Sequence, residues 1–120
     1  MASGVITNPN KASTFTPTVS KTSGNSTVYS ADGARSGNIC SLSITFTNGS
    51  DTSVGGNSFV GTITNAPRPL VSANGIGYYG SHLFVAALTP TGAITVRVIN
   101  GGGYWVATER HGITIMYICA

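Results

Sequence analysis

Apolar and polar residues alternate with a period of two along much of the chain. The clearest case is the segment 39–47, where the apolar side chains at 42, 44 and 46 are separated by serine and threonine. The segment 93–99 repeats the pattern, with Ile94, Val96 and Val98 on the side expected to face inward. Such alternation is typical of a strand with one buried face. The pattern therefore predicts β-strands in both places.

Turn residues separate further segments of the same kind. We expect about eight strands in all, at 27–30, 39–47, 58–64, 70–79, 82–89, 93–99, 104–107 and 113–119, with turns that include 31–34 and 109–112. Short strands at this spacing are typical of an antiparallel β-sandwich or barrel. Residues 1–24 keep no period and predict an extended N-terminal arm or linker, which leaves 25–120 as the head domain.

The last predicted strand, 113–119, is almost wholly apolar. A strand that is apolar on both faces needs cover on both sides, from the centre of a sandwich or from another subunit. A domain of 120 residues gains buried area by association. We therefore expect copies of the chain to dock together through this segment.

The composition excludes helical fold classes. Gly, Ser, Thr and Asn make up nearly half of the chain, which contains two lysines, one glutamate and no glutamine. β-Branched residues fit a pleated surface, and the usual helix formers are scarce. A helical bundle, a coiled coil and a Rossmann-type domain are therefore excluded, and one all-β domain is expected.

The charge pattern and the apolar runs argue against two kinds of partner. The net charge is +3, but the six cations are scattered, whereas a nucleic-acid binder clusters them. No apolar run is long enough to span a bilayer, so membrane insertion is not expected. Residues 1–10 lack the features of a signal peptide. We expect a cytoplasmically made assembly part, or a piece of a longer protein with an added Met1.

Catalysis is not expected. The three carboxylates, Asp32, Asp51 and Glu109, all fall in predicted turns, where a solvated role is usual. Sugar hydrolysis needs two carboxylates held close together. The glycines of 75–80 match a dinucleotide fingerprint but lack its strand-to-helix context. The sequence therefore predicts no catalytic residue and no cofactor.

Cysteine and histidine leave alternatives open. Cys40 and Cys119 lie in strand segments, either as buried free thiols or as a disulfide between neighbouring strands. Two cysteines cannot complete a tetrahedral zinc site within one chain, so no metal is expected there. His82 and His111 adjoin turns, where a solvated or hydrogen-bonded side chain is usual. In a threefold assembly His111, or less readily His82, could supply three ligands to an ion on the axis.

Aromatic pairs beside glycine-rich turns form the candidate binding site. Carbohydrate recognition typically stacks an aromatic face on the sugar and adds polar groups for the hydroxyls. The alternative is that these rings simply pack in the core, which suits Trp105 best, whereas Tyr104 is the better ligand candidate. The ligand-binding residues expected are Tyr104, Arg110, Tyr79, Tyr78, Glu109, His111 and Trp105.

Three motifs resemble those of one known family, the C-terminal head domains of bacteriophage tail proteins and receptor-binding tips. Arg35–Thr45 resembles the family's "Arg-x-Gly-Asn-hydrophobic" strand. Val60–Pro69 is similar to its "Gly-Thr-Leu-Pro-x-x-Arg-Pro" corner, although Thr64 replaces the first proline. Thr91–Val96 is similar to its "x-Gly-x-Ile-x-Val" hairpin. The order and spacing match over roughly residues 28 to 118.

The resemblance implies a jelly-roll-like antiparallel β-sandwich of the tumour-necrosis-factor/complement-C1q type, which forms a homotrimer at the tip of a phage tail fibre or baseplate. Such heads bind a host cell-surface glycan, often in clefts near subunit boundaries. They are made in the host cytoplasm and act outside the cell, on the virion. Because the same architecture caps bacterial surface proteins, a structural trimerisation cap or a bacterial surface adhesin domain is the alternative.

Overall fold

The computed structural model describes residues 12–48, 52–53, 56–79, 82–100, 104–105 and 109–119. In these ranges the chain forms strands and no helix, so none of them holds a helix that could span a membrane. The strands are β1 (Ser13–Phe15), β2 (Thr18–Ser23), β3 (Ser26–Ser36), β4 (Ile39–Asn48), β5 (Thr52–Ser53), β6 (Asn57–Thr64), β7 (Ala73–Tyr79), β8 (His82–Leu88), β9 (Ala93–Asn100), β10 (Tyr104–Trp105) and β11 (Arg110–Ile118).

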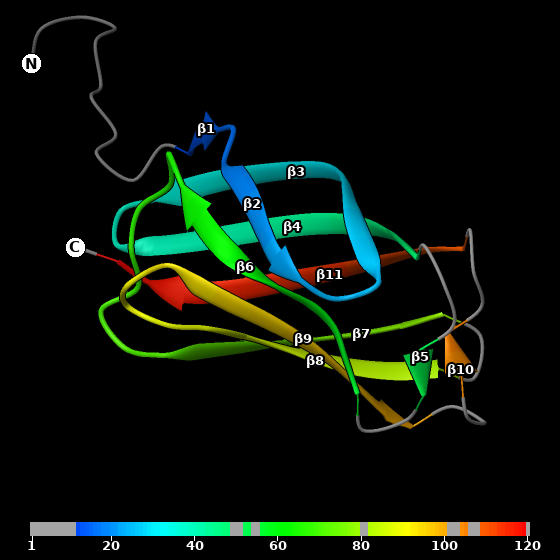
Figure 1. Cartoon of the computed structure of the whole chain (residues 1–120). Helices are drawn as coiled ribbons and strands as arrows, with labels where there is room; N and C mark the ends of the chain where they lie inside the picture. The colour runs from blue at the N-terminus through cyan, green and yellow to red at the C-terminus, as the bar shows by residue number, and fades with distance from the viewer. Residues whose placement is uncertain are drawn as a thin grey trace, which may run out of the picture.

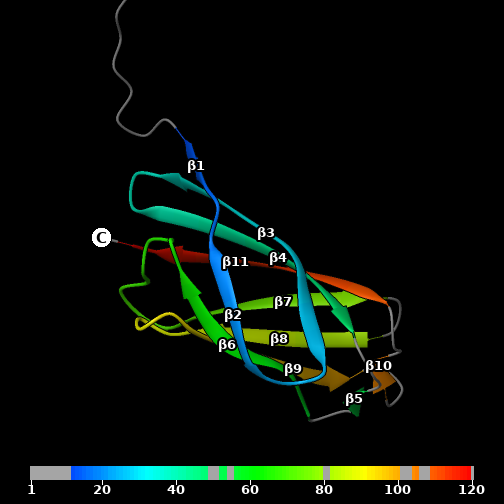
Figure 2. The same cartoon turned by 45° about the horizontal axis from the view of Figure 1, so that its top comes forward.

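Nine strands form one antiparallel sheet in the order β1-β3-β4-β11-β7-β8-β9-β6-β2, and β5 pairs with β10 in a separate ribbon. The sheet curls so that β2 and β6 approach β3 across the interior (Figures 1 and 2). The all-β prediction is confirmed, and a curled antiparallel sheet is compatible with the expected sandwich of jelly-roll type.

The core lies inside the curl and takes one face of each long strand. The predicted inward side of 93–99 is confirmed, because Ile94, Val96 and Val98 are fully buried. Strand β8 buries only the side of the chain that carries Phe84. The buried apolar side chains from β4, β8 and β11 are Cys40, Leu42, Ile44, Phe46, Phe84, Ala86, Leu88, Ile113, Ile115, Tyr117 and, just beyond β11, Cys119.

The N-terminal segment differs from the expected arm. Residues 1–11 lie outside the described ranges, but β1 pairs with β3 and β2 pairs with β6. Phe15 and Val19 pack against the core, and the Phe15 ring lies over Gly33. Strand β2 is a sheet edge with mostly exposed side chains, so it needs little of the alternation by which strands are recognised.

Two expected turns are parts of strands. Residues 31–34 lie within β3, which pairs on one side with β1 and on the other with β4. The chain reverses instead at Gly37, whose φ is 60°. Residues 110–112 begin β11 and pair with β4, starting with Arg110 opposite Thr47. Local turn signals are overridden in both places because neighbouring strands satisfy the backbone.

Candidate functional site

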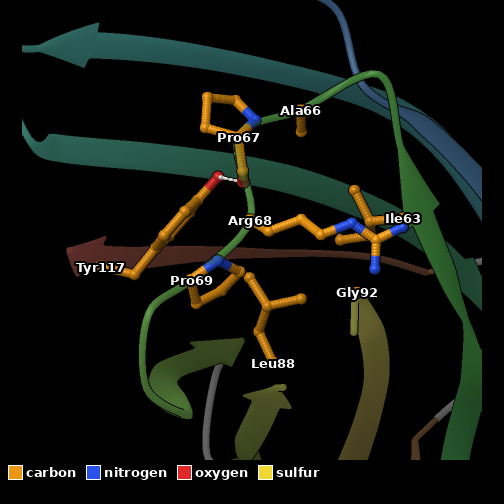
Figure 3. Close-up of a pocket in the computed structure, with 8 residues that line it drawn as sticks. All are labelled: Ile63, Ala66, Pro67, Arg68, Pro69, Leu88, Gly92 and Tyr117. Atoms are coloured by element: carbon orange, nitrogen blue, oxygen red, sulfur yellow. Dashed lines mark hydrogen bonds between the residues drawn. The ribbon is translucent and has the colours of Figure 1, made fainter. Parts of the chain in front are cut away.

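Side-chain hydrogen bonds hold the corner between β6 and β7, and Figure 3 shows the one from Tyr117 to Pro67. Arg68 Nη1 donates to the Thr91 carbonyl oxygen over 2.5 Å, and the Tyr117 hydroxyl donates to the Pro67 carbonyl oxygen over 2.8 Å. The cavity they enclose has a volume of about 10 Å³, room for about one water molecule. This corner therefore joins parts of the fold and has no space for a ligand.

The three motifs that carry the family resemblance meet at this end of the molecule. Arg35 Nε donates to the Gly37 carbonyl oxygen at the β3–β4 turn, over 2.8 Å. The amide of Ile63 donates to the Gly92 carbonyl oxygen, which ties β6 to the β8–β9 turn. The amide of Cys119 donates to the Asn38 carbonyl oxygen. The motifs therefore close one end of the fold.

Both cysteines are buried at the same end. Their sulfur atoms lie 2.6 Å apart, and neither side chain is accessible to solvent. Burial, and then the hydrogen bond to Cys119, raise the pKa of the Cys40 thiol to about 11. Burial, with Cys40 as the next cause, also raises the pKa of Tyr117. At neutral pH Cys40 is therefore a thiol, which is a poor nucleophile.

The residues predicted to bind a ligand belong to strands that meet at the other end of the sheet. Tyr78–Tyr79 ends β7, Tyr104–Trp105 forms β10 and Arg110–His111 begins β11, which both views place together (Figures 1 and 2). The side chains of Tyr78–Tyr79 and Tyr104–Trp105 lie outside the described part of the structure. Their contact with a ligand stays a prediction.

Arg110 is exposed and stacks on an aromatic ring that the sequence did not point to. Its Cζ atom lies 3.7 Å from the centroid of the Tyr29 ring, a cation–π contact. Tyr29 sits at a bulge in β3, where the pairing with β4 shifts between Val28 and Ser30. A bulge re-aims side chains, so this partner depends on the register of three strands.

His111 lies in the core and not in the solvated turn that was expected. The residue is 1% exposed, and the centroids of its ring and the Phe84 ring lie 5.8 Å apart in a T-shaped arrangement. In the sheet it lies opposite Phe46 of β4. Glu109 Oε2 lies 3.9 Å from His111 Nε2. Because the imidazole faces inward, it reaches neither a surface ligand nor an ion on an external symmetry axis.

Within the described ranges, no three His, Cys, Asp or Glu side chains lie close enough together to hold a metal ion. His82 begins β8, but its side chain is outside the described part. The axial histidine site therefore has no described side chain to support it.

A larger hollow lies on the outer face of β6, β7, β8 and β9, and we call it the outer groove. Its volume is about 310 Å³. Four strands meet there in register, with Ala87 between Asn74 and Thr95, and Val85 opposite Arg97. The groove is lined by Asn57, Asn74, Val85, Ala87, Thr95 and Arg97.

The outer groove combines a low apolar floor with polar walls. Val85 and Ala87 are short and form the floor, while Asn57 and Asn74 each present an amide that both donates and accepts hydrogen bonds. No carboxylate in the described chain pairs with the exposed Arg97 guanidinium. The groove is therefore more polar than a typical small-molecule pocket, with four polar side chains around two apolar ones.

Sequence reasoning missed the outer groove. The predicted site consists of aromatic and charged residues, whereas the groove is lined by two amides, one hydroxyl, one guanidinium and the short apolar side chains of Val85 and Ala87. The only local signal was the polar side of 93–99, where Thr95 and Arg97 alternate with the buried residues. The asparagines come from strands up to 40 positions away, so only the sheet brings them together.

Comparisons of the chain with models of known families, with curated proteins and with solved structures found no match.

Proposed function

We propose that the chain is the receptor-binding head of a phage tail fibre or baseplate protein, which attaches as a homotrimer to a host cell-surface saccharide. The observation that carries the proposal is the outer groove, a hollow of about 310 Å³ with its own hydrogen-bonding groups. In the alternative, a bacterial surface adhesin domain, the same groove would bind the saccharide, but the domain would belong to a bacterial surface protein and not to a phage.

The chemistry of the outer groove matches a sugar. A pyranose presents hydroxyl groups around its edge and C–H groups on its faces. The amides of Asn57 and Asn74 can bind neighbouring hydroxyls, and the apolar floor at Ala87 can accept a C–H face. Arg97 adds several fixed donors from β9. Because β6, β7 and β9 are inner strands of the sheet, the backbone that carries these groups is already ordered before binding.

An exposed apolar surface beside this groove supports assembly of the head with copies of itself. On β11, Met116 is 65% exposed and Ile118 is 50% exposed, although the alternate residues are buried. Ile118 pairs directly with exposed Ile39, and the Leu70 amide donates to the Ile118 carbonyl oxygen. We call this set the apolar patch, which consists of Ile39, Leu70, Val71, Ile76, Met116 and Ile118.

A second copy of this chain fits the apolar patch better than a charged partner does. Its members are linked by strand pairing, because Ile118 lies opposite Ile39, and Ile76 lies opposite Thr114, two positions from Met116. An exposed apolar surface of this kind is typical of an interaction site. The threefold symmetry itself comes from the family resemblance. Ile76 belongs to the patch and pairs with Val85 in the outer groove, so the groove borders the expected subunit boundary. Threefold display would raise avidity for a repeated glycan.

A structural trimerisation cap is the second candidate, and one observation favours it. The motifs that carry the family resemblance all serve packing at the corner end, for example through Arg68 and Thr91. A cap would therefore keep the motifs and the apolar patch without any ligand. The two candidates share the oligomeric state and differ only in binding.

The test is binding of the full chain to a glycan array and to host cells. We expect Arg97→Ala to weaken glycan binding by about 10-fold or more, the usual effect of losing a hydrogen bond to a charged group. Lys21→Ala is the matched control, since it removes an exposed cation from β2, away from the groove, and should leave binding unchanged.

Each other outcome overturns part of the proposal. If Tyr104→Ala abolishes binding and Arg97→Ala does not, the ligand site is the sheet end predicted from the sequence. If the wild-type oligomer is intact and binds neither glycans nor host cells, the chain is a cap. The mass of each variant in solution is compared with that of the wild type. This comparison separates a loss of assembly from a loss of glycan binding.

A further inference from the structure

The chain has two cysteines, and the fold brings them together from positions 79 apart. Cys40 lies on β4 opposite Tyr117, while Cys119 follows β11 and its amide donates to the Asn38 carbonyl oxygen. The two side chains are therefore diagonal neighbours on the inner face of adjacent strands. With the sulfur atoms 2.6 Å apart, only a small side-chain movement separates them from the bond length of about 2.0 Å.

We propose that Cys40 and Cys119 form an intrachain disulfide that fastens the C-terminal end of β11 to β4. The two strands are already paired along their whole length, so the bond requires no change in register. The two cysteines have no competing cysteine partner within the chain. The inference does not depend on the proposed function.

A small-molecule disulfide such as oxidised glutathione supplies the oxidant. The Cys119 thiol loses its proton and attacks one glutathione sulfur, which forms a mixed disulfide and releases one glutathione thiolate. Cys40 then loses its proton and attacks the Cys119 sulfur, which forms the protein disulfide and releases the second thiolate. The two thiolates take up the two protons. The cysteines have lost two electrons in total, and the oxidant has gained them.

The position of each cysteine suggests this order of attack. Cys119 lies just beyond β11, where a bridge to Pro69 and the amide hydrogen bond to the Asn38 carbonyl oxygen hold its backbone. Local opening beyond the end of β11 would expose Cys119 and leave β4 intact, because strand ends open at lower cost than strand interiors. Cys40 lies inside a long strand, and burial keeps its thiol protonated. Oxidation should therefore be slow in the folded chain.

The bond would stabilise the apolar patch as well as the core. Ile39 precedes Cys40, Ile118 precedes Cys119, and the two isoleucines pair across the strands. A cross-link between positions 79 apart removes much conformational freedom from the unfolded chain. The bond also keeps the C-terminal end of β11 paired with β4.

The experiment starts from the whole chain, which is unfolded, reduced and then refolded with oxidised glutathione, so that slow oxidation of the folded chain does not decide the result. The protein is then unfolded, treated with iodoacetamide and weighed intact. We expect no alkylation before reduction, two alkylations after it, and a single-chain band on a non-reducing gel. We also expect reductant to lower the Tm of the oxidised protein by roughly 10 °C. The Tm of the Cys40→Ala/Cys119→Ala double variant should not respond to reductant.

Two results would overturn the proposal. Two alkylations without reduction would show free thiols, and covalent dimers on the gel would show pairing between chains. If the double variant fails to fold, the mass measurement on the wild type still decides. Either result would refute the disulfide without affecting the proposal that the outer groove binds a glycan, so the two proposals are tested independently.

Discussion

Glycine at position 92 allows the β8–β9 turn to touch the end of β6. Its φ of 87° suits glycine, and its carbonyl oxygen accepts a hydrogen bond from the Ile63 amide over 2.8 Å. A Cβ atom at this position would lie 2.6 Å from the Ile63 carbonyl oxygen. The next residue back, Thr91, accepts the hydrogen bond from Arg68. This turn therefore depends on a residue without a side chain.

Replacing this glycine should destabilise the fold. We expect Gly92→Ala to lower the free energy of unfolding by about 2 kcal/mol, because it adds a strained backbone to a close contact. The measurement is equilibrium unfolding in denaturant. The matched control is Gly112→Ala on β11, whose Cβ would meet only Thr45 Oγ1, at 3.8 Å. It should change stability by less than about 0.5 kcal/mol. Equal effects of the two substitutions would contradict this account.

At the scale of elements, the N-terminal strands decide how the sheet ends. β1 covers the part of the β3 edge at Gly33–Arg35, and β2 covers the part of the β6 edge at Val60–Thr64. The covering strands also bring Phe15 and Val19 onto the core. An arm in solution would contribute none of this.

Truncation distinguishes an arm from a pair of strands. Deleting residues 1–24 removes both covering strands and the packing of Phe15 and Val19, worth about 2–3 kcal/mol in all. We expect Tm to fall by roughly 10 °C and the protein to aggregate more readily. Deleting residues 1–11 leaves every described strand in place and is the control. Identical thermal unfolding of the two truncated proteins would restore the interpretation as an arm.

For the molecule as a whole, the two faces of strand β11 differ in burial, although both carry apolar side chains. One face, which includes Ile113 and Ile115, is covered by the chain's own core. The other face, with Met116 and Ile118, is half or more exposed in the single chain. The expectation that this strand needs cover on both sides is therefore met on one side by the fold, and the second side is the basis for the proposed assembly.

The oligomeric state tests this second side. We expect the protein in solution to have three times the chain mass of 12.2 kDa. A charge in the apolar patch should dissociate it, because an unpaired buried cation is costly at an interface. Met116→Lys should therefore shift the mass measured by sedimentation to one chain, whereas Thr62→Lys, on an exposed site of β6, should not. A wild type that stays a well-folded single chain at micromolar concentration would refute the assembly.

Much of the secondary structure could be predicted because it is locally encoded. Alternation on β4 and β9 lies in consecutive residues, and Ile44 and Val96 are buried as the period of two requires. The shortage of helix formers settled the fold class in the same way. The predictions were wrong where a local turn sequence is overridden by pairing with distant strands. Asp32 and Gly33 are typical turn residues, but they lie within β3, which pairs with both β1 and β4.

The candidate site could not be predicted, since it depends on which strands become neighbours. Asn57, Asn74 and Arg97 share one groove only through the order β7-β8-β9-β6. Pairing of distant segments also placed Tyr29 under Arg110 and brought Cys40 beside Cys119. Which face of most strands is apolar can be read from consecutive residues, because side chains along a strand point alternately to its two faces. The tertiary structure alone decided which polar faces lie side by side, because strand order and register arise from contacts far apart in sequence.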